Sequence, residues 1–190
     1  MATVSAPHPC IVTVFEASMA DAERVTDLIE SAYRGPGSKQ GWTTEADLLD
    51  GQRTDLDAVR DALARDDVRL LIGTSGTSES DPLLGCCQIE RRSAAAYFGS
   101  FAVRPDLQNA GLGRTLLAAA EMTAVREWQA EVMEMTVIAQ RAELIAWYQR
   151  RGYRLTGETR PFPYDDARAG LPRREDLHFV VLEKRLAPAA

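Results

Sequence analysis

The sequence predicts a mixed α/β fold in which helices cover both faces of a central, mostly antiparallel sheet. Three strand-like apolar runs follow one another in mid-chain with short joints, which is typical of an antiparallel meander. Apolar residues spaced by three and four positions mark helices before and after these runs. The length of 190 residues, 45% of them hydrophobic, suits one well-filled core, so we expect a single domain over residues 1–190.

The expected strands are short runs rich in β-branched and apolar residues, bounded by polar or glycine-containing joints. In chain order they are 11–15, 68–72, 83–89, 97–103, 132–138, 153–155 and 177–186. In the strand 97–103, simple alternation places Tyr97, Phe101 and Val103 on one face and Phe98 on the other. The connection 156–176 is expected to be a long loop, and residues 1–9 and 187–190 are expected to be flexible ends.

The expected helices combine helical spacing of apolar residues with capping residues at their ends. The first helix begins at a cap at Ser18 or Asp21 and ends at the break at 35–37. The second helical region begins at Leu48 and continues through a cap at Thr54 or Asp55 to Leu63. The last two helices are expected from Gly113 to Trp128 and over 142–151.

Charge and cysteine content exclude several classes of function. The net charge of −6 and the pI of about 5.0 argue against nucleic acid and anionic membranes as partners. We expect a cytoplasmic protein, because the first residues lack the basic and apolar parts of a secretory signal. Cys10, Cys86 and Cys87 have no metal-ligand spacing, so we expect buried free thiols and no metal site, with Cys86 and Cys87 on opposite faces of a strand.

The segment 103–117 carries the clearest functional signal. It is a strand end followed by a turn with Gly111 and Gly113 that opens a helix. The first N–H groups of a helix lack internal partners and lie at the positive end of its dipole, and glycines allow a phosphate to approach the main chain. A dinucleotide fingerprint would need glycine in place of Leu116, and a triphosphate loop would need lysine in place of Arg114 with different spacing. Taken alone, the two glycines are as consistent with a strand-to-helix turn whose glycines only permit close packing as with a phosphate site.

The pattern Val-x-Pro-x-x-Gln-x-x-Gly-x-Gly from Val103 to Gly113 resembles the acyl-coenzyme A signature of the GNAT superfamily of N-acetyltransferases. The segment from Tyr148 to Tyr153 is similar to the Tyr-x-x-x-Gly-aromatic segment of the same superfamily. The resemblance implies a GNAT fold, in which the strands ending at Val103 and Ile138 splay into a V, and acetyl-coenzyme A as the acyl donor.

The resemblance also implies which residues hold the cofactor. The loop from Gln108 through Asn109, Ala110 and Gly111 to Gly113 would hold the pyrophosphate with its amides, together with Arg114. The pantetheine arm would pair with the main chain at Phe101 and Val103, where a bulge would direct an amide at the thioester carbonyl. Arg141 stands near a position that is asparagine in many members, and it either reaches a phosphate or is solvated.

Tyr148 would be the general acid that protonates the departing thiolate, although its helical spacing alone fits a core aromatic residue. The strand before the loop lacks the carboxylate that serves as base in some relatives. We therefore expect a water relay ordered by Tyr97 and Ser100, with Glu90 as a candidate base through water and Glu134 as the other nearby acid.

Trp42, Phe162 and Tyr164 are candidates for the wall of an acceptor pocket, with Asp165 or Asp166 attracting a cationic amine. The segment around Phe162 fits a dimer contact or a lid equally well.

The function predicted from these residues is transfer of an acetyl group from acetyl-coenzyme A to a primary amine of a small acceptor, directly within a ternary complex. A larger acyl group is an alternative within the same chemistry. The alternative from another class is a non-catalytic acyl-coenzyme A sensor or partner-binding domain. A homodimer is implied only by the frequency of dimers among relatives.

Overall fold

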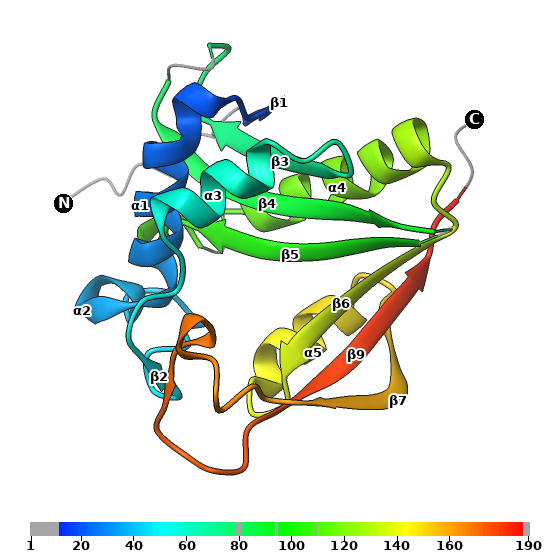
Figure 1. Cartoon of the computed structure of the whole chain (residues 1–190). Coiled ribbons are helices and arrows are strands. Elements are labelled where there is room, and N and C mark those ends of the chain that lie inside the picture. Colours follow the sequence, from blue (N-terminus) through cyan, green and yellow to red (C-terminus); the bar gives the residue numbers. More distant parts are fainter. Residues whose placement is uncertain (1–11, 79–80, 94, 109, 188–190) are drawn as a thin grey trace, which may run out of the picture.

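A seven-stranded sheet in the order β1-β3-β4-β5-β6-β9-β7 runs through the molecule (Figure 1). The computed structural model describes residues 12–78, 81–93, 95–108 and 110–187. The strands of this sheet are β1 (Thr13–Glu16), β3 (Val68–Thr74), β4 (Leu83–Arg92), β5 (Ala95–Val103), β6 (Val132–Ile138), β7 (Arg154–Pro161) and β9 (His178–Arg185). The predictions for 1–9, Cys10 and 188–190 lie outside the described residues.

The helices lie on both faces of this sheet (Figure 1). They are α1 (Ala22–Tyr33), α2 (Gly35–Ser38), α3 (Leu56–Leu63), α4 (Leu112–Trp128) and α5 (Ala142–Gln149), with 3-10 turns at Met19–Asp21, Pro105–Leu107 and Ala167–Ala169. The helices α1 and α3 pack on one face, and α4 and α5 pack on the other. None of the helices in the described ranges is both long and apolar enough to cross a membrane.

The strands β5 and β6 diverge after a short stretch of pairing. They form the one parallel pair of the described sheet, with Ala95–Tyr97 against Val132–Glu134, while all its other strand pairs are antiparallel. Beyond Tyr97 the two strands separate into a V, which is visible between the green and yellow strands in Figure 1. The predicted mostly antiparallel sheet with a V-shaped splay is confirmed.

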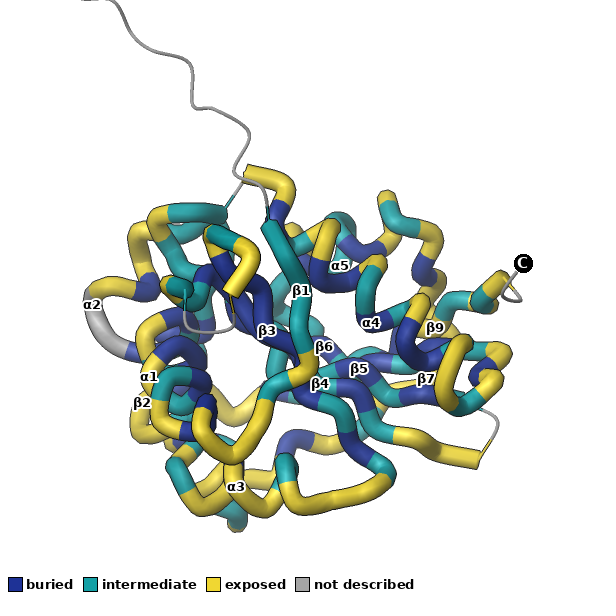
Figure 2. The backbone as a smooth tube through the Cα atoms, turned by 90° about the horizontal axis from the view of Figure 1, so that it is seen from above, coloured by how far each residue is buried: buried dark blue, intermediate teal, exposed yellow. Residues whose placement is uncertain are grey.

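Two apolar cores form because successive strand residues point to opposite faces. Cys86 packs with α1 and α3, and Cys87 packs with α4, as expected for neighbouring residues on one strand. Both are buried free thiols. Figure 2 shows the buried residues concentrated along the central strands, with exposed residues in the outer loops.

A bulge in β5 reverses the alternation of its side chains. Cys86 pairs with Ala102 and Gln88 pairs with Gly99, so β5 holds one residue more than β4 between these pairs. Ser100, within the bulge, has a positive φ of 44°. The bulge moves Phe101 to the face of Phe98, with ring centroids 5.2 Å apart. The prediction that Phe101 shares a face with Tyr97 was therefore wrong.

Two further expectations are corrected. The strand expected at 153–155 is the eight-residue strand β7, which takes up the first part of the expected loop. Its residues are mostly exposed and it pairs only with β9, so it has no apolar alternation for the sequence to reveal. Near Leu48 there is no helix: β2 (Leu49–Asp50) pairs with β8 (Leu171–Pro172) instead.

Candidate functional site

The turn between β5 and α4 leaves main-chain amides without acceptors. Gly111 is the N-cap of α4 at φ +86°, and this glycine has no side chain that could cap the helix. Among the described residues, no hydrogen-bond acceptor is found for the amides of Gly111, Leu112 and Gly113. These groups lie at the positive end of the helix dipole, where an anion would be stabilised.

The predicted run of free amides is shorter than expected. The amides of Gln108, Ala110 and Arg114 donate to carbonyls of the same turn, at 3.4, 3.3 and 3.0 Å. Asn109 lies outside the described residues. The three amides from Gly111 to Gly113 therefore form the part of the loop that is available to a ligand.

A cavity of about 500 Å3 opens beside this turn, and we call it the loop cavity. Its lining combines the turn, the end of β5, the start of α5 and the residues after α2. The lining residues are Ala32, Tyr33, Trp42, Thr43, Phe101, Ala102, Val103, Gln108, Ala110, Gly111, Gly113, Arg114, Arg141, Leu144, Trp147, Tyr148 and Arg151. The structure thus brings together every described residue that was predicted to hold the cofactor.

The loop cavity is positively charged although the chain is acidic. Arg114, Arg141 and Arg151 line it, and none of its described lining residues is a carboxylate. Burial lowers the pKa of Arg151, and the charges of Arg150 and Arg114 lower it further. This shift is typical of a guanidinium among like charges, so the cavity favours an anionic ligand.

Aromatic rings form one wall of the loop cavity. The Trp147 ring lies 6.5 Å from the ring of Trp42 and 6.0 Å from that of Phe101, and the Arg151 guanidinium lies 3.4 Å from the Trp147 ring centroid. A Cβ at Gly113 would lie 3.1 Å from Phe101 Cζ and 3.4 Å from Trp147 Cζ2. Glycine therefore allows α4 to approach this wall closely.

Tyr148 lies between the loop cavity and a second one. Its side chain is 4% exposed, and its hydroxyl makes no hydrogen bond to any described residue. Burial raises the pKa of Tyr148 well above its ordinary value, so the phenol stays protonated throughout the working pH range.

The second cavity, of about 260 Å3, lies in the V between β5 and β6, and we call it the sheet cavity. Its lining residues are Tyr33, Glu45, Arg53, Gln88, Tyr97, Phe98, Gly99, Ser100, Phe101, Met135, Thr136, Val137, Ile138, Arg141, Leu144, Tyr148 and Phe179. Five of these also line the loop cavity: Tyr33, Phe101, Arg141, Leu144 and Tyr148. The two cavities therefore meet at the Tyr148 side chain.

Hydroxyl groups fix the walls of the sheet cavity. The hydroxyls of Tyr97 and Thr136 lie 2.6 Å apart and join β5 to β6 across the V. Tyr33 donates from its hydroxyl to the carbonyl of Phe101 at 2.7 Å, next to the bulge. Tyr97 and Ser100, the two residues expected to order a water, both line this cavity.

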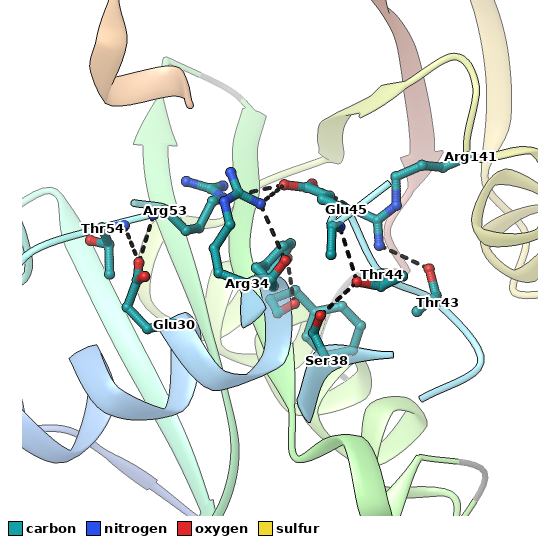
Figure 3. Close-up of polar contacts among 12 residues, drawn as sticks. Glu30, Arg34, Ser38, Thr43, Thr44, Glu45, Arg53, Thr54 and Arg141 are labelled. Carbon is teal, nitrogen blue, oxygen red and sulfur yellow. Dashed lines mark hydrogen bonds and ion pairs between the residues drawn. The ribbon is translucent and has the colours of Figure 1, made fainter. Parts of the chain in front are cut away.

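A buried cluster of charges closes one side of the sheet cavity (Figure 3). The carboxylate of Glu45 lies 2.8 Å from Arg141 Nη1, 3.1 Å from Arg34 Nη1 and 3.8 Å from Arg53 Nε. Burial alone would raise the pKa of Glu45, but the charges of Arg141, Arg53 and Arg34 outweigh it and lower this pKa. Arg141 is 10% exposed and also donates to Thr43 at 2.8 Å, so it is not solvated.

Several predicted residues lie outside both cavities. The Glu90 carboxylate lies 3.3 Å from Arg65 and 3.5 Å from Arg92, on the part of the sheet away from the V opening. Glu134 pairs with Arg160 at 3.0 Å. The structure therefore brings neither carboxylate to Tyr148: Glu90 pairs with Arg65, before β3, and with Arg92 on its own strand, and Glu134 pairs with Arg160 on β7.

The aromatic pair predicted to wall the acceptor pocket is structural. Phe162 is 4% exposed and packs in a small core with Leu49 and Leu177. The Tyr164 hydroxyl accepts from the amide of Leu177 at 2.7 Å. Asp166 pairs with Arg168. Of the predicted wall only Trp42 lines a cavity, and that is the loop cavity.

The polar and aromatic residues of this site that sequence reasoning missed include Tyr33, Glu45, Arg53, Trp147 and Arg151. Trp147 directly precedes the segment from Tyr148 to Tyr153, and Arg151 lies within it. Their closeness to this motif could have identified them as site residues. The other three lie far from either motif and have no local signal. Among the described residues no group of histidine, cysteine and acidic side chains is suited to bind a metal ion.

Comparison with known proteins agrees with this geometry. Residues 72–155 match the family model described as the acetyltransferase (GNAT) domain. A search of curated protein sequences gave no significant match.

Solved structures similar to this chain share the fold at low sequence identity. The ribosomal-protein-S18-alanine N-acetyltransferase from Escherichia coli is 16% identical with a TM-score of 0.68, covering 95% of this chain and 97% of that one. The putative acetyltransferase yncA from Salmonella typhimurium, solved with acetyl-CoA, is 19% identical with a TM-score of 0.66, covering 95% and 96%. The spermidine/spermine N-acetyltransferase SpeG from Vibrio cholerae is 12% identical with a TM-score of 0.63, covering 92% of each chain. Residues 72–155 thus match the GNAT acetyltransferase domain, and the chain has the fold of these solved acetyltransferase structures.

Proposed function

We propose that the protein transfers an acetyl group from acetyl-coenzyme A directly to a primary amine of a small acceptor. The observation that carries this proposal is the pair of cavities that meet at Tyr148. A thioester entering from one side and an amine entering from the other would meet beside a neutral phenol. The similar structures named for N-acetylation of alanine and of spermidine support an amine as the acceptor.

The loop cavity suits coenzyme A. Its pyrophosphate would accept hydrogen bonds from the free amides of Gly111, Leu112 and Gly113, with Arg114 and Arg151 supplying positive charge. The pantetheine arm would lie along β5 at Phe101 and Val103, in the space that β6 leaves open. Acetyl-coenzyme A supplies the activated acetyl thioester.

The reaction would then proceed by direct acyl transfer, without an acyl-enzyme. The amine nitrogen attacks the thioester carbonyl carbon, a C–N bond forms, and the C–S bond breaks as the tetrahedral intermediate collapses. The nitrogen releases its second proton to water as the amide forms, the leaving thiolate takes the proton of Tyr148, and the Tyr148 phenolate regains a proton from solvent. Main-chain amides at the bulge of Ser100 and Phe101 would stabilise the oxyanion.

The amine must lose its proton before attack, which costs about 4 to 5 kcal/mol at pH 7 for an amine of pKa about 10.4. We assign this step to a water ordered by Tyr97 and Ser100, which both line the sheet cavity. Glu90 lies outside the cavity, and Glu45 has a lowered pKa and three arginine neighbours. Neither carboxylate is suited to be the base.

Two measurements test the proposal. Calorimetry with acetyl-coenzyme A should show binding at one site per chain. Thiol release from acetyl-coenzyme A should then depend on an added amine, in a panel of amino acids, amino-acid amides and polyamines. A protein that binds the cofactor but releases no thiol with any amine would be the acyl-coenzyme A sensor instead. Location in the cytoplasm and assembly as a homodimer stay predictions from the sequence.

A further inference from the structure

The charged groups of the sheet cavity do not balance. Among the described residues that line it, the ionised side chains at neutral pH are Glu45, Arg53 and Arg141. Arg34 contacts the same Glu45 carboxylate at 3.1 Å from outside this lining. Three guanidinium groups face the Glu45 carboxylate, and the cluster keeps a net positive charge when Glu30, beside Arg53, is counted as well (Figure 3).

Glu45 is already paired with an arginine at each of its two carboxylate oxygens. Its Oε1 accepts from Arg141 at 2.8 Å, and its Oε2 accepts from Arg34 at 3.1 Å. Its side chain is only 9% exposed. A second ammonium group, as on a polyamine, would therefore meet two arginines without a free carboxylate to pair with it.

Arg53 is the cationic group that is open to a ligand. Its side chain is 32% exposed, and its Nε lies 3.8 Å from Glu45, which is beyond hydrogen-bond distance. Neither Nη atom donates a hydrogen bond to any residue in the described ranges. Its main chain is fixed, because Glu30 Oε1 accepts the amides of Arg53 and Thr54 at 2.6 and 2.7 Å.

Arg141 supplies an independent observation. Its side chain is 10% exposed, and its Nε is buried without a hydrogen-bond partner among the described residues. A buried guanidinium N–H without a partner is costly unless a ligand satisfies it. Arg141 lines both cavities, so a ligand in the V would lie within its reach.

We propose that the acceptor is a small, amino-acid-like amine that also carries an oxyanion group, a carboxylate or a phosphonate, which the guanidinium of Arg53 binds with the help of Arg141. This inference rests on the proposed function and names the acceptor class of the same site. It replaces the expectation that Asp165 or Asp166 attracts a cationic amine, because the charged residues that line the sheet cavity are mostly arginines. The cavity volume of about 260 Å3 suits a molecule of this size.

Matched acceptors test the proposal. The assay compares the twenty common L-amino acids with their amides, 2-aminoethylphosphonate with 2-aminoethanol, and spermidine with all of them. For the best acid, kcat/KM should exceed that of its amide by about tenfold or more, the range expected for a hydrogen bond to a charged group. The comparison between carboxylates and the phosphonate decides which oxyanion is preferred.

Three variants locate the effect. Arg53→Gln should raise KM for the acid about tenfold or more and leave the amide nearly unchanged, while Arg53→Lys should restore part of the difference. Arg60→Gln is the control, because Arg60 is half exposed on α3 and lines neither cavity. The affinity for coenzyme A and the melting temperature show that each variant is folded.

The outcomes separate this inference from the proposed function. Preference for amides or spermidine, or an acid-to-amide ratio that Arg53→Gln leaves unchanged, would overturn the inference and leave N-acetyl transfer standing. If no amine is acetylated, calorimetry of the same acids with the coenzyme A complex decides whether the cavity binds an oxyanion. Binding that Arg53→Gln abolishes would support the anion site in a protein that is not a transferase, and no binding would overturn it.

Discussion

Arg141 and Glu45 form an ion pair with a separation of 2.8 Å, although 96 positions separate them in the sequence. Their side chains are 10% and 9% exposed. The pair joins the start of α5 to the segment before β2; Arg141 lines both cavities and Glu45 lines the sheet cavity. Its loss would therefore affect both stability and the site.

Glu45→Gln should lower the free energy of unfolding by about 3 to 5 kcal/mol, because it leaves Arg34 and Arg141 buried without a countercharge. Urea unfolding at pH 7 measures this loss. Asp47→Asn is the control, since the pair of Asp47 with Lys39 is exposed and should change stability little. Equal effects of the two substitutions would show that the buried cluster does not stabilise the fold.

Glu45 also predicts a dependence of stability on pH. Its pKa is lower in the folded than in the unfolded protein, so the stabilisation is present above the unfolded pKa of about 4.3 and is lost as pH falls through the folded pKa. The wild type should lose stability below about pH 4.3, and the difference between wild type and Glu45→Gln should shrink over the same range. Urea unfolding at a series of pH values checks this, and a constant difference would contradict it.

Tyr148→Phe should lower kcat about 100-fold or more and leave coenzyme A affinity unchanged, because it removes only the proton donor. The raised pKa of Tyr148 means that the wild type should show no loss of general-acid activity up to about pH 10. Steady-state kinetics across pH measures both effects. Tyr164→Phe, outside both cavities, should keep kcat. Full activity of Tyr148→Phe would remove Tyr148 from the mechanism.

Gly111→Ala and Gly157→Ala should separate backbone strain from cofactor binding. Both glycines have φ of +86°, so each alanine should cost about 1 to 2 kcal/mol. Only Gly111 lines the loop cavity, so only Gly111→Ala should also weaken coenzyme A binding, by about tenfold, or about 1.4 kcal/mol. Thermal melting and calorimetry measure the two quantities. An equal affinity for the cofactor in both variants would exclude a phosphate site at this turn.

Cys86 and Cys87 should not react with thiol reagents in the folded protein. Burial raises the pKa of Cys86 to about 12 and that of Cys87 well above its ordinary value, so neither thiol forms the reactive thiolate. In a Cys10→Ser background, a colorimetric thiol reagent should modify neither thiol until urea is added. Rapid modification with loss of activity would instead point to an acyl-enzyme on cysteine.

The sequence alone determined the features that depend on neighbours along the chain. The glycine turn at Gly111 and Gly113, the helix that follows it and the position of Tyr148 were predicted because spacing within one element carries the signal. The opposite burial of Cys86 and Cys87 followed from the period of a strand.

Only the tertiary structure determined which residues line the sheet cavity and which charges meet there. The bulge at Ser100 moved Phe101 to the other face, because one extra residue in a strand reverses all later side chains. The charge cluster joins Arg34, Glu45, Arg53 and Arg141 from separate parts of the chain. The physical reason is that an ion pair depends on distance in space, and the fold alone brings these groups within a few ångströms of one another.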